Sequence, residues 1–219
     1  MTRAEARARI EEIGIIPALR VHSSEDALFA AETVARSGIP IIEVTMTVPG
    51  ALEVIHTLVR KTPGVLIGAG TVLDLSWARR CLDAGATFLT SPGLDLGIVD
   101  FGASQDVAVL PGALTPTEVI AAAKAGADFI KIYPCGQVGG PAYIRALKQP
   151  FPELRFIASG GVNQANAAEY ILAGATAVGI GADLIHRDAI TRRQDGWIVE
   201  LSRRYVQMIG QAREQLRAD

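Results

Sequence analysis

The stretch Ala125-Gly126-Ala127-Asp128-Phe129-Ile130-Lys131-Ile132-Tyr133-Pro134 contains the pattern that decides the fold of this chain. Its short run between Gly126 and Pro134 is apolar on both faces, which is typical of a strand buried on both sides of a parallel sheet. The Ala-Gly-Ala triplet before the run suits the end of a helix, because glycine readily adopts the left-handed conformation that closes helices. The stretch therefore predicts a helix that turns directly into a buried parallel strand.

The same junction recurs along the chain. Ala84-Gly85-Ala86 and Ala173-Gly174-Ala175 each precede another short apolar run, and Ser37-Gly38-Ile39 has the same place before a fourth. Amphipathic segments with helical spacing separate these runs. The expected helices include 24–37, 49–61, 76–84, 116–125 and 164–173, and the expected strands are 14–20, 41–46, 65–70, 87–91, 107–110, 128–133, 155–159 and 177–180.

Eight strands that alternate with helices over 219 residues predict an α/β fold, namely a (β/α)₈ TIM barrel. We expect a single domain over residues 1–219, with an N-terminal helix near 1–12, a short helix near 182–185 and a C-terminal helix over 195–218. A doubly wound open sheet is the alternative, but it normally carries a glycine-rich phosphate motif after its first strand. The first strand here ends in Leu19-Arg20-Val21-His22, which lacks that motif.

The composition excludes several classes of function. A net charge of -2 offers no surface for nucleic acid or for an anionic membrane. No apolar run is long enough to span a bilayer. The two cysteines show no paired spacing and the start of the chain has no apolar signal core, so we expect a cytoplasmic protein. The three histidines are isolated, so we expect neither a metal nor another cofactor.

Two charged residues stand inside apolar runs, Lys131 in the stretch quoted above and Glu43 in Ile39-Pro40-Ile41-Ile42-Glu43-Val44-Thr45-Met46. Burial disfavours the charged ammonium and so favours a neutral, nucleophilic amine, as a Schiff-base lysine requires. The alternative is a strand-end lysine that reaches solvent or forms a structural ion pair with Glu43. A buried ion pair is a poor source of stability, however, so an acid/base beside a nucleophile is the better explanation of the two charges.

The carboxyl ends of the strands should carry the chemistry of a barrel of this kind. Arg20 ends the first strand and suits bidentate capture of a carboxylate, although a salt bridge at the rim is equally open. Thr71 either donates a hydrogen bond to the same carboxylate or merely starts the next turn. Thr45 and Pro92 also lie at strand ends and are expected in the substrate pocket.

Glycines follow the last two strands, where barrels of this type frequently bind phosphate. Backbone amides at such glycines can approach an anion closely. The alternative is that they only form tight turns. The expected phosphate-binding residues are Ser159, Gly160, Gly161, Gly179 and Gly181.

Taken together, these residues resemble the 2-keto-3-deoxy-6-phosphogluconate (KDPG) aldolases, a family that also covers 4-hydroxy-2-oxoglutarate (KHG) aldolase. The resemblance implies a TIM barrel and a class I aldolase, in which Lys131 forms a Schiff base with pyruvate and Glu43 is the general acid/base. It also implies that Arg20 and Thr71 hold the carboxylate, that the glycines hold a phosphate, and that the protein is a homotrimer. It runs from residue 15 to about residue 190 and rests on segments 16–20, 42–47, 67–72, 91–93, 110–112, 130–134 and 159–162.

The chain departs from the family pattern at three positions. Thr47 stands in the substrate pocket where many members have arginine, and Ser159 stands where many have threonine. The last strand ends in Gly179-Ile180-Gly181-Ala182-Asp183, where many members have a double glycine followed by serine, and the Asp183 carboxylate would repel a phosphate unless its side chain points away as a helix cap. These differences leave the second substrate open and make a phosphogalactonate-type aldolase an alternative.

Two further alternatives come from other classes of protein. One is another phosphate-binding barrel enzyme, such as an epimerase or an isomerase of the tryptophan pathway, which uses acid/base residues and no imine. The other is a barrel retained or engineered as a subunit of an oligomeric assembly.

Overall fold

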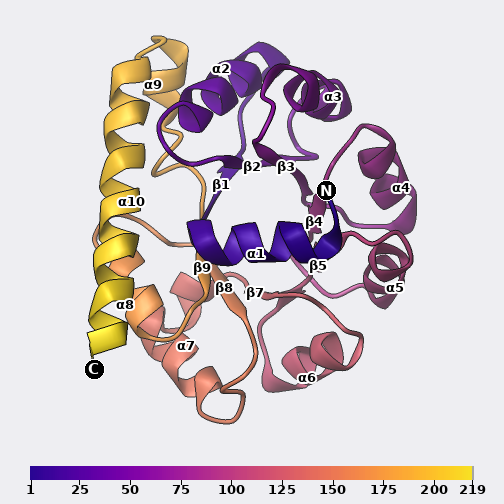
Figure 1. Ribbon diagram of the computed structural model, residues 1–219, viewed down its shortest axis with the longest axis vertical. Helices are drawn as coiled ribbons and strands as arrows, with labels where there is room; N and C mark the ends of the chain where they lie inside the picture. Colours follow the sequence, from indigo (N-terminus) through magenta and orange to yellow (C-terminus); the bar gives the residue numbers. More distant parts are fainter. Residues whose placement is uncertain (219) are drawn as a thin grey trace.

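A ring of parallel strands forms the centre of the computed structural model, which describes residues 1–218 (Figure 1). Hydrogen-bonded neighbours follow the order β5-β4-β3-β2-β1-β9-β8-β7-β6. The strands are β1 (Ile15–Leu19), β2 (Ile41–Thr45), β3 (Leu66–Gly70), β4 (Phe88–Thr90), β5 (Ala108–Leu110), β6 (Gly112–Ala113), β7 (Ile130–Ile132), β8 (Phe156–Ser159) and β9 (Ala177–Ile180).

The helices lie outside this ring, except for α1, which crosses one end of it (Figure 1). They are α1 (Arg3–Ile13), α2 (Ser24–Ala35), α3 (Ala51–Lys61), α4 (Leu75–Asp83), α5 (Leu96–Ser104), α6 (Pro116–Lys124), the 3₁₀ helix η1 (Cys135–Val138), α7 (Pro141–Lys148), α8 (Ala167–Leu172), α9 (Arg187–Thr191) and α10 (Asp195–Ala218).

The predicted (β/α)₈ barrel is confirmed, with one refinement at its fifth strand. β5 pairs with β4, β6 pairs with β7, and only Pro111 separates the two segments. They are therefore two halves of one barrel strand, interrupted where proline removes a donor. Residue 219, the last residue of the predicted domain, lies outside the described residues.

The helix-to-strand junctions form as the Ala-Gly-Ala triplets predicted. Gly85, Gly126 and Gly174 have φ values of 101°, 81° and 101°. A residue with a Cβ is strained in that left-handed region, so glycine is favoured at each junction. The repeated triplet therefore marks, in the sequence, the junctions between repeated β/α units.

Two local predictions were wrong. Residues 182–185 form a single turn, and the short helix in this region is α9, at Arg187–Thr191. The turn does not continue because His186 is extended and begins the next helix instead. The helix expected over 164–173 begins later, at Ala167 after Asn166, and ends at Leu172.

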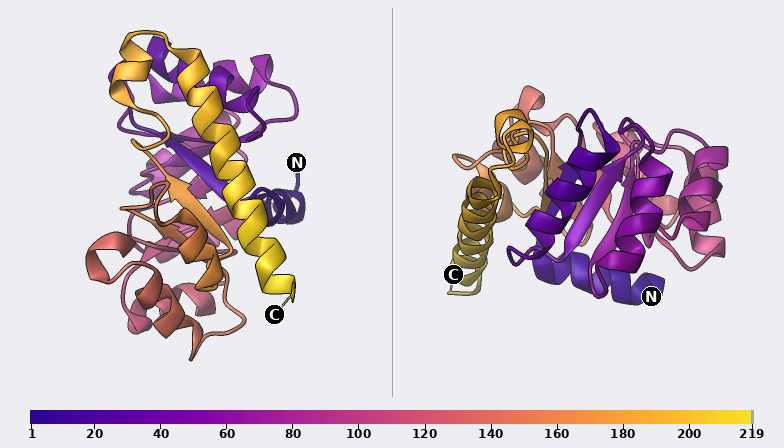
Figure 2. Two further views of the ribbon diagram at one scale, coloured as in Figure 1. Left: turned by 90° about the vertical axis from the view of Figure 1, so that its left-hand side faces the viewer. Right: turned by 90° about the horizontal axis from the view of Figure 1, so that it is seen from above.

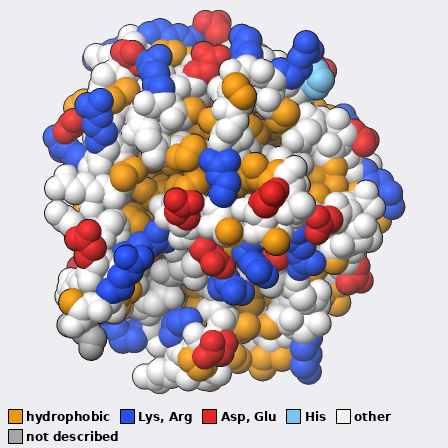
Figure 3. Space-filling model, in the orientation of Figure 1, with side chains coloured by type: hydrophobic (Ala, Val, Ile, Leu, Met, Phe, Trp, Pro, Cys, Tyr) orange, Lys and Arg blue, Asp and Glu red, His pale blue; other side chains and the backbone are white. Residues whose placement is uncertain are grey.

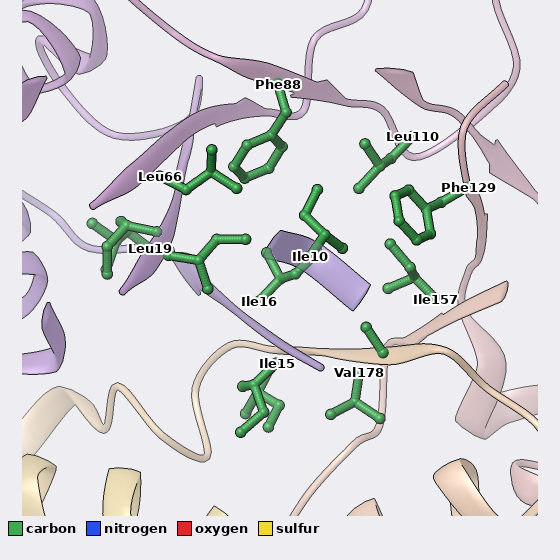
Figure 4. Close-up of a cluster of buried hydrophobic side chains, with 14 of the residues drawn as sticks. Ile10, Ile15, Ile16, Leu19, Leu66, Phe88, Leu110, Phe129, Ile157 and Val178 are labelled. Atoms are coloured by element: carbon green, nitrogen blue, oxygen red, sulfur yellow. The ribbon is translucent and has the colours of Figure 1, made fainter. Parts of the chain in front are cut away.

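The barrel interior is filled from the end at which the strands begin. Ile10 of α1 is fully buried and lies among inward-pointing side chains of the strands, including Phe88, Leu110 and Phe129 (Figure 4). Burying one such side chain contributes about 1.5–3 kcal/mol. The outer surface of this end carries charged side chains of both signs (Figure 3). Because α1 covers this end of the barrel, a site must lie at the opposite end, where the strands finish.

The C-terminal helix α10 occupies the predicted residues 195–218 and runs along the outside of the barrel, where it packs against α8, α2 and α9 (Figure 2). Tyr205 of α10 is fully buried in this contact. Among residues 1–218, no helix combines the length and the apolar character needed to cross a membrane.

Candidate active site

Lys131 and Glu43 meet inside the open end of the barrel. Lys131 comes from β7 and Glu43 from β2, and their Nζ and Oε2 atoms are 3.5 Å apart. The two residues are only 6% and 3% exposed. Thr90 of β4 places its hydroxyl 3.5 Å from the same amine. Three strands that are distant in the sequence therefore enclose one amine in a nearly water-free position.

The carboxylate of Glu43 is only partly satisfied by its neighbours. Its Oε1 atom is buried and has no hydrogen-bond partner among the described residues. Buried polar atoms are nearly always paired, because an unpaired one costs stability. This arrangement is therefore unlike a structural ion pair, and it leaves one carboxylate oxygen available to exchange a proton with a ligand on Lys131.

Gly70 at the end of β3 makes room for this carboxylate. A Cβ atom at position 70 would lie 2.1 Å from Oε1 of Glu43. No side chain fits in that space unless Glu43 moves. Gly70 therefore makes room for the Glu43 carboxylate, in addition to leading into the turn after β3.

A cavity of about 380 Å³ opens beside Lys131 at the same end of the barrel. The structure gathers there all five residues that the sequence assigned to phosphate, together with Arg20. The predicted site residues that border it are Lys131, Arg20, Ser159, Gly160, Gly161, Gly179 and Gly181.

Two of these glycines have left-handed backbones that fix the shape of the loop after β8. Gly160 and Gly161 have φ values of 83° and 89°. The Gly160 carbonyl accepts a hydrogen bond from the Gly136 amide at 2.8 Å, whereas the amides of Gly160 and Gly161 donate none to other described residues. We call Gly160, Gly161, Gly179 and Gly181 the glycine cradle, in which the amides of Gly160 and Gly161 are free to bind a ligand.

The remaining predicted site residues do not border this cavity. Thr71 follows β3 in a left-handed conformation with φ of 59°, and Pro92 follows β4. Thr45 is fully buried, and its hydroxyl donates to the Leu19 carbonyl at 2.7 Å and accepts a hydrogen bond from the Thr47 hydroxyl at 2.6 Å. Arg20 forms no ion pair among the described residues and lies on the side of the glycine cradle rather than beside Thr71.

The cavity residues that sequence reasoning missed include Tyr133, whose ring centroid lies 6.0 Å from the Lys131 amine. The signal was present, because residues two apart on a strand point to the same face. Asp183, noted in the sequence as a departure, also borders the cavity. Its carboxylate accepts a hydrogen bond from the Tyr205 hydroxyl of α10, a partner that no local pattern could identify.

Other candidate chemistries find no support in the described residues. Burial raises the pKa of Cys135 to about 11 and that of Cys81 to about 12, so both remain protonated thiols at neutral pH. Within residues 1–218, no three or more His, Cys, Asp or Glu side chains are placed to hold a metal ion. Lys131 is thus the best-placed nucleophile at this end of the barrel.

A family model described as "Aldolase: KDPG and KHG aldolase" matches residues 6–201 of the chain. The chain is 32% identical over 203 residues to a 2-dehydro-3-deoxy-phosphogluconate aldolase of Pseudomonas aeruginosa, covering 92% of each protein. It is 35% identical over 172 residues to a probable 2-dehydro-3-deoxy-6-phosphogalactonate aldolase of Rhizobium meliloti, covering 78% of this chain and 81% of that one.

Among solved structures, the chain is similar to the KDPG aldolase of Legionella pneumophila, with a TM-score of 0.84 and 30% identity over 90% of this chain and 96% of that one. In that crystal structure, pyruvate is captured as a covalent carbinolamine intermediate. The family model, the related sequences and the solved structure therefore agree on one family of proteins.

Proposed function

The chain belongs to the KDPG and KHG aldolase family, a family of class I aldolases, and we propose that it cleaves a 2-keto-3-deoxy sugar acid or a 4-hydroxy-2-keto acid to pyruvate and an aldehyde. The observation that carries this proposal is the buried contact between Lys131 and Glu43, 3.5 Å apart, beside an open cavity. The contact supplies a nucleophile and a proton carrier in one water-poor position, as imine chemistry requires.

The proposed reaction begins when neutral Lys131 attacks the C2 carbonyl of the substrate and loses water to give a cationic imine. The imine nitrogen then accepts the electron pair of the C3–C4 bond, so cleavage leaves an enamine and releases the aldehyde. Glu43 takes the proton of the C4 hydroxyl and afterwards protonates C3 of the enamine. Hydrolysis of the resulting imine frees pyruvate and restores Lys131.

We assign the two ends of the substrate to two groups of residues. Thr71 and Arg20 hold the carboxylate next to the keto group, with Arg20 binding from the side of the glycine cradle that it borders. Ser159 with the glycine cradle holds a phosphate at the far end. Support for the second assignment comes from the free amides of Gly160 and Gly161. Thr45, Thr47 and Pro92 complete the pocket around the reacting carbons.

The experiment that tests the function is a coupled assay of pyruvate release across three substrates. These are the 6-phosphorylated gluconate-type and galactonate-type 2-keto-3-deoxy acids, which follow the names of the two relatives, and 4-hydroxy-2-oxoglutarate, which follows the family description. Release from at least one of them is expected. An epimerase or isomerase would release no pyruvate from any of the three.

Replacing Arg20 by alanine is expected to weaken every 2-keto acid alike, because the proposed contact is to the carboxylate that all of them share. Hydrogen bonds to a charged group contribute about 1.5–3 kcal/mol, so the concentration of pyruvate that half-saturates borohydride trapping should rise about 10- to 100-fold. Arg20 borders the glycine cradle, however. A loss confined to phosphorylated substrates would therefore move Arg20 to the phosphate end.

Replacing Gly161 by alanine is expected to raise KM for a phosphorylated substrate about tenfold or more while leaving 4-hydroxy-2-oxoglutarate nearly unchanged. The added Cβ would lie 3.1 Å from the Gly136 Cα and would strain a φ of 89°, so the amide shifts away from the anion. The matched control is Gly126→Ala, which has a φ of 81° and open space around the new Cβ, far from the cavity. Equal losses on both substrates would contradict the phosphate assignment.

We further propose that the protein is a homotrimer, as the resemblance to the family implies, and that it acts in the cytoplasm, as its two cysteines without paired spacing indicate. Light scattering in solution tests the trimer. A much larger particle without lyase activity would instead support the assembly subunit.

A further inference from the structure

A carboxylate borders the glycine cradle, where an anionic substrate group would have to bind. Asp183 lies two residues after Gly181 and borders the same cavity as Gly160 and Gly161. A negative side chain so close to a bound phosphate would oppose it, because like charges repel strongly in a partly buried site. Either this chain does not accept a phosphate, or something holds the carboxylate away from the cradle.

The structure supplies a partner for that carboxylate on α10, which runs along the outside of the barrel and does not border the cavity. Tyr205 of α10 is fully buried, and its hydroxyl donates a hydrogen bond to Oδ2 of Asp183. Hydrogen bonds to an ionised carboxylate are among the strong ones in proteins. Burial, followed by the bond to Asp183, raises the pKa of Tyr205 above its usual range, so the hydroxyl stays protonated and keeps donating.

The backbone of the same turn is fixed as well. The amides of Leu184 and Ile185 both donate to the Gly181 carbonyl, at 3.1 and 3.0 Å, and both side chains are buried. The turn therefore cannot rotate as a unit to relieve the charge. The side chain of Asp183 is the movable part, and Tyr205 determines where it lies.

We propose that Tyr205 is a positioning residue for substrate selection: it draws the carboxylate of Asp183 toward α10 and thereby lets the glycine cradle accept a phosphate. This inference rests on the proposed aldolase function and adds to it a device that acts only on the far end of the substrate. Tyr205 belongs to neither the lysine site nor the cradle, so its hydroxyl acts through Asp183 alone.

The test compares Tyr205→Phe with wild type on a phosphorylated 2-keto-3-deoxy acid and on unphosphorylated 4-hydroxy-2-oxoglutarate. Removing the hydroxyl frees the carboxylate to turn into the cavity. KM for the phosphorylated acid is expected to rise about tenfold, as for one like charge brought near an anion. Its kcat, and both constants for the unphosphorylated acid, should stay within about twofold of wild type.

The double variant Asp183→Asn/Tyr205→Phe separates this mechanism from a general loss of structure. With the charge removed, KM for the phosphorylated acid should return to within about threefold of wild type although the hydroxyl is still missing. Tyr143→Phe is the matched control, because it removes a hydroxyl that donates to the Leu114 carbonyl and does not border the cavity. That variant should show no difference between the two substrates.

Several results would overturn the inference. They are equal losses on both substrates in Tyr205→Phe, a double variant that does not recover, and a wild type with no preference for the phosphorylated acid. Should Tyr205→Phe fail to fold, Asp183→Asn alone tests the inference. A tenfold lower KM for the phosphorylated acid in this variant would show that the wild-type carboxylate already faces the cavity and would reject the inference, whereas an unchanged KM would support it. A wild type that releases no pyruvate at all would reject the proposed function itself.

Discussion

Treatment with pyruvate and borohydride is expected to add one pyruvyl group to the protein, at Lys131, and to abolish its activity. Borohydride reduces an imine to a stable amine, so the adduct marks the residue that carries the imine. Lys131 is 6% exposed and its amine faces Glu43 and Thr90 at the open end of the barrel. Lys131→Ala should lose essentially all turnover, because no other group there can act as the electron sink.

Lys148 is the informative control for this result. Burial lowers the pKa of Lys148, which favours its neutral, nucleophilic form. Its amine donates to the carbonyls of Pro152 and Leu154, at 2.5 and 2.9 Å, and does not border the cavity beside Lys131. Lys148→Ala should keep turnover and trapping. Peptide mapping that placed the adduct on Lys148 would reject the assignment of Lys131.

The fold was predictable from the sequence because the same glycine-containing junction recurs between helix and strand in several β/α units. Gly85, Gly126 and Gly174 each close a helix in a conformation that other residues avoid, so the junctions could be found one by one. The interruption of the fifth strand at Pro111 and the late start of α8 could not be found in this way. Both depend on which neighbouring backbone groups pair, and that pairing is decided in the folded barrel.

The candidate site was likewise predictable only in part. Lys131 and Glu43 were found because a charge inside an apolar strand is anomalous at the level of sequence. The cavity residue Tyr133 could have been found from its strand face. The contact between Asp183 and Tyr205 could not, because no local pattern shows how α10 packs against the turn after β9. Sequence patterns reveal which residues are unusual, and the structure shows what they contact.

Replacing Glu43 by glutamine is expected to lower turnover by a factor of about 10²–10⁴ while the protein stays folded, since that is the usual contribution of general acid–base catalysis. Glutamine has nearly the same shape but cannot take a proton from the substrate. Imine formation with pyruvate should continue slowly, because Lys131 is intact. Rates of single turnover and of borohydride trapping, measured on the same sample, separate the two steps.

Asp128→Asn is the matched control, because Asp128 is also a buried carboxylate beside a cation. Its oxygens accept from Arg3 at 2.9 Å and from the Val109 amide at 3.2 Å, at the closed end of the barrel. Breaking that satisfied pair should lower the melting temperature and leave kcat alone. Glu43, whose Oε1 has no hydrogen-bond partner among residues 1–218, should show the opposite pattern: a large loss of kcat and a smaller change in melting temperature. Near-normal turnover in Glu43→Gln, with a melting temperature as low as that of Asp128→Asn, would mean that Glu43 is only a structural partner of Lys131.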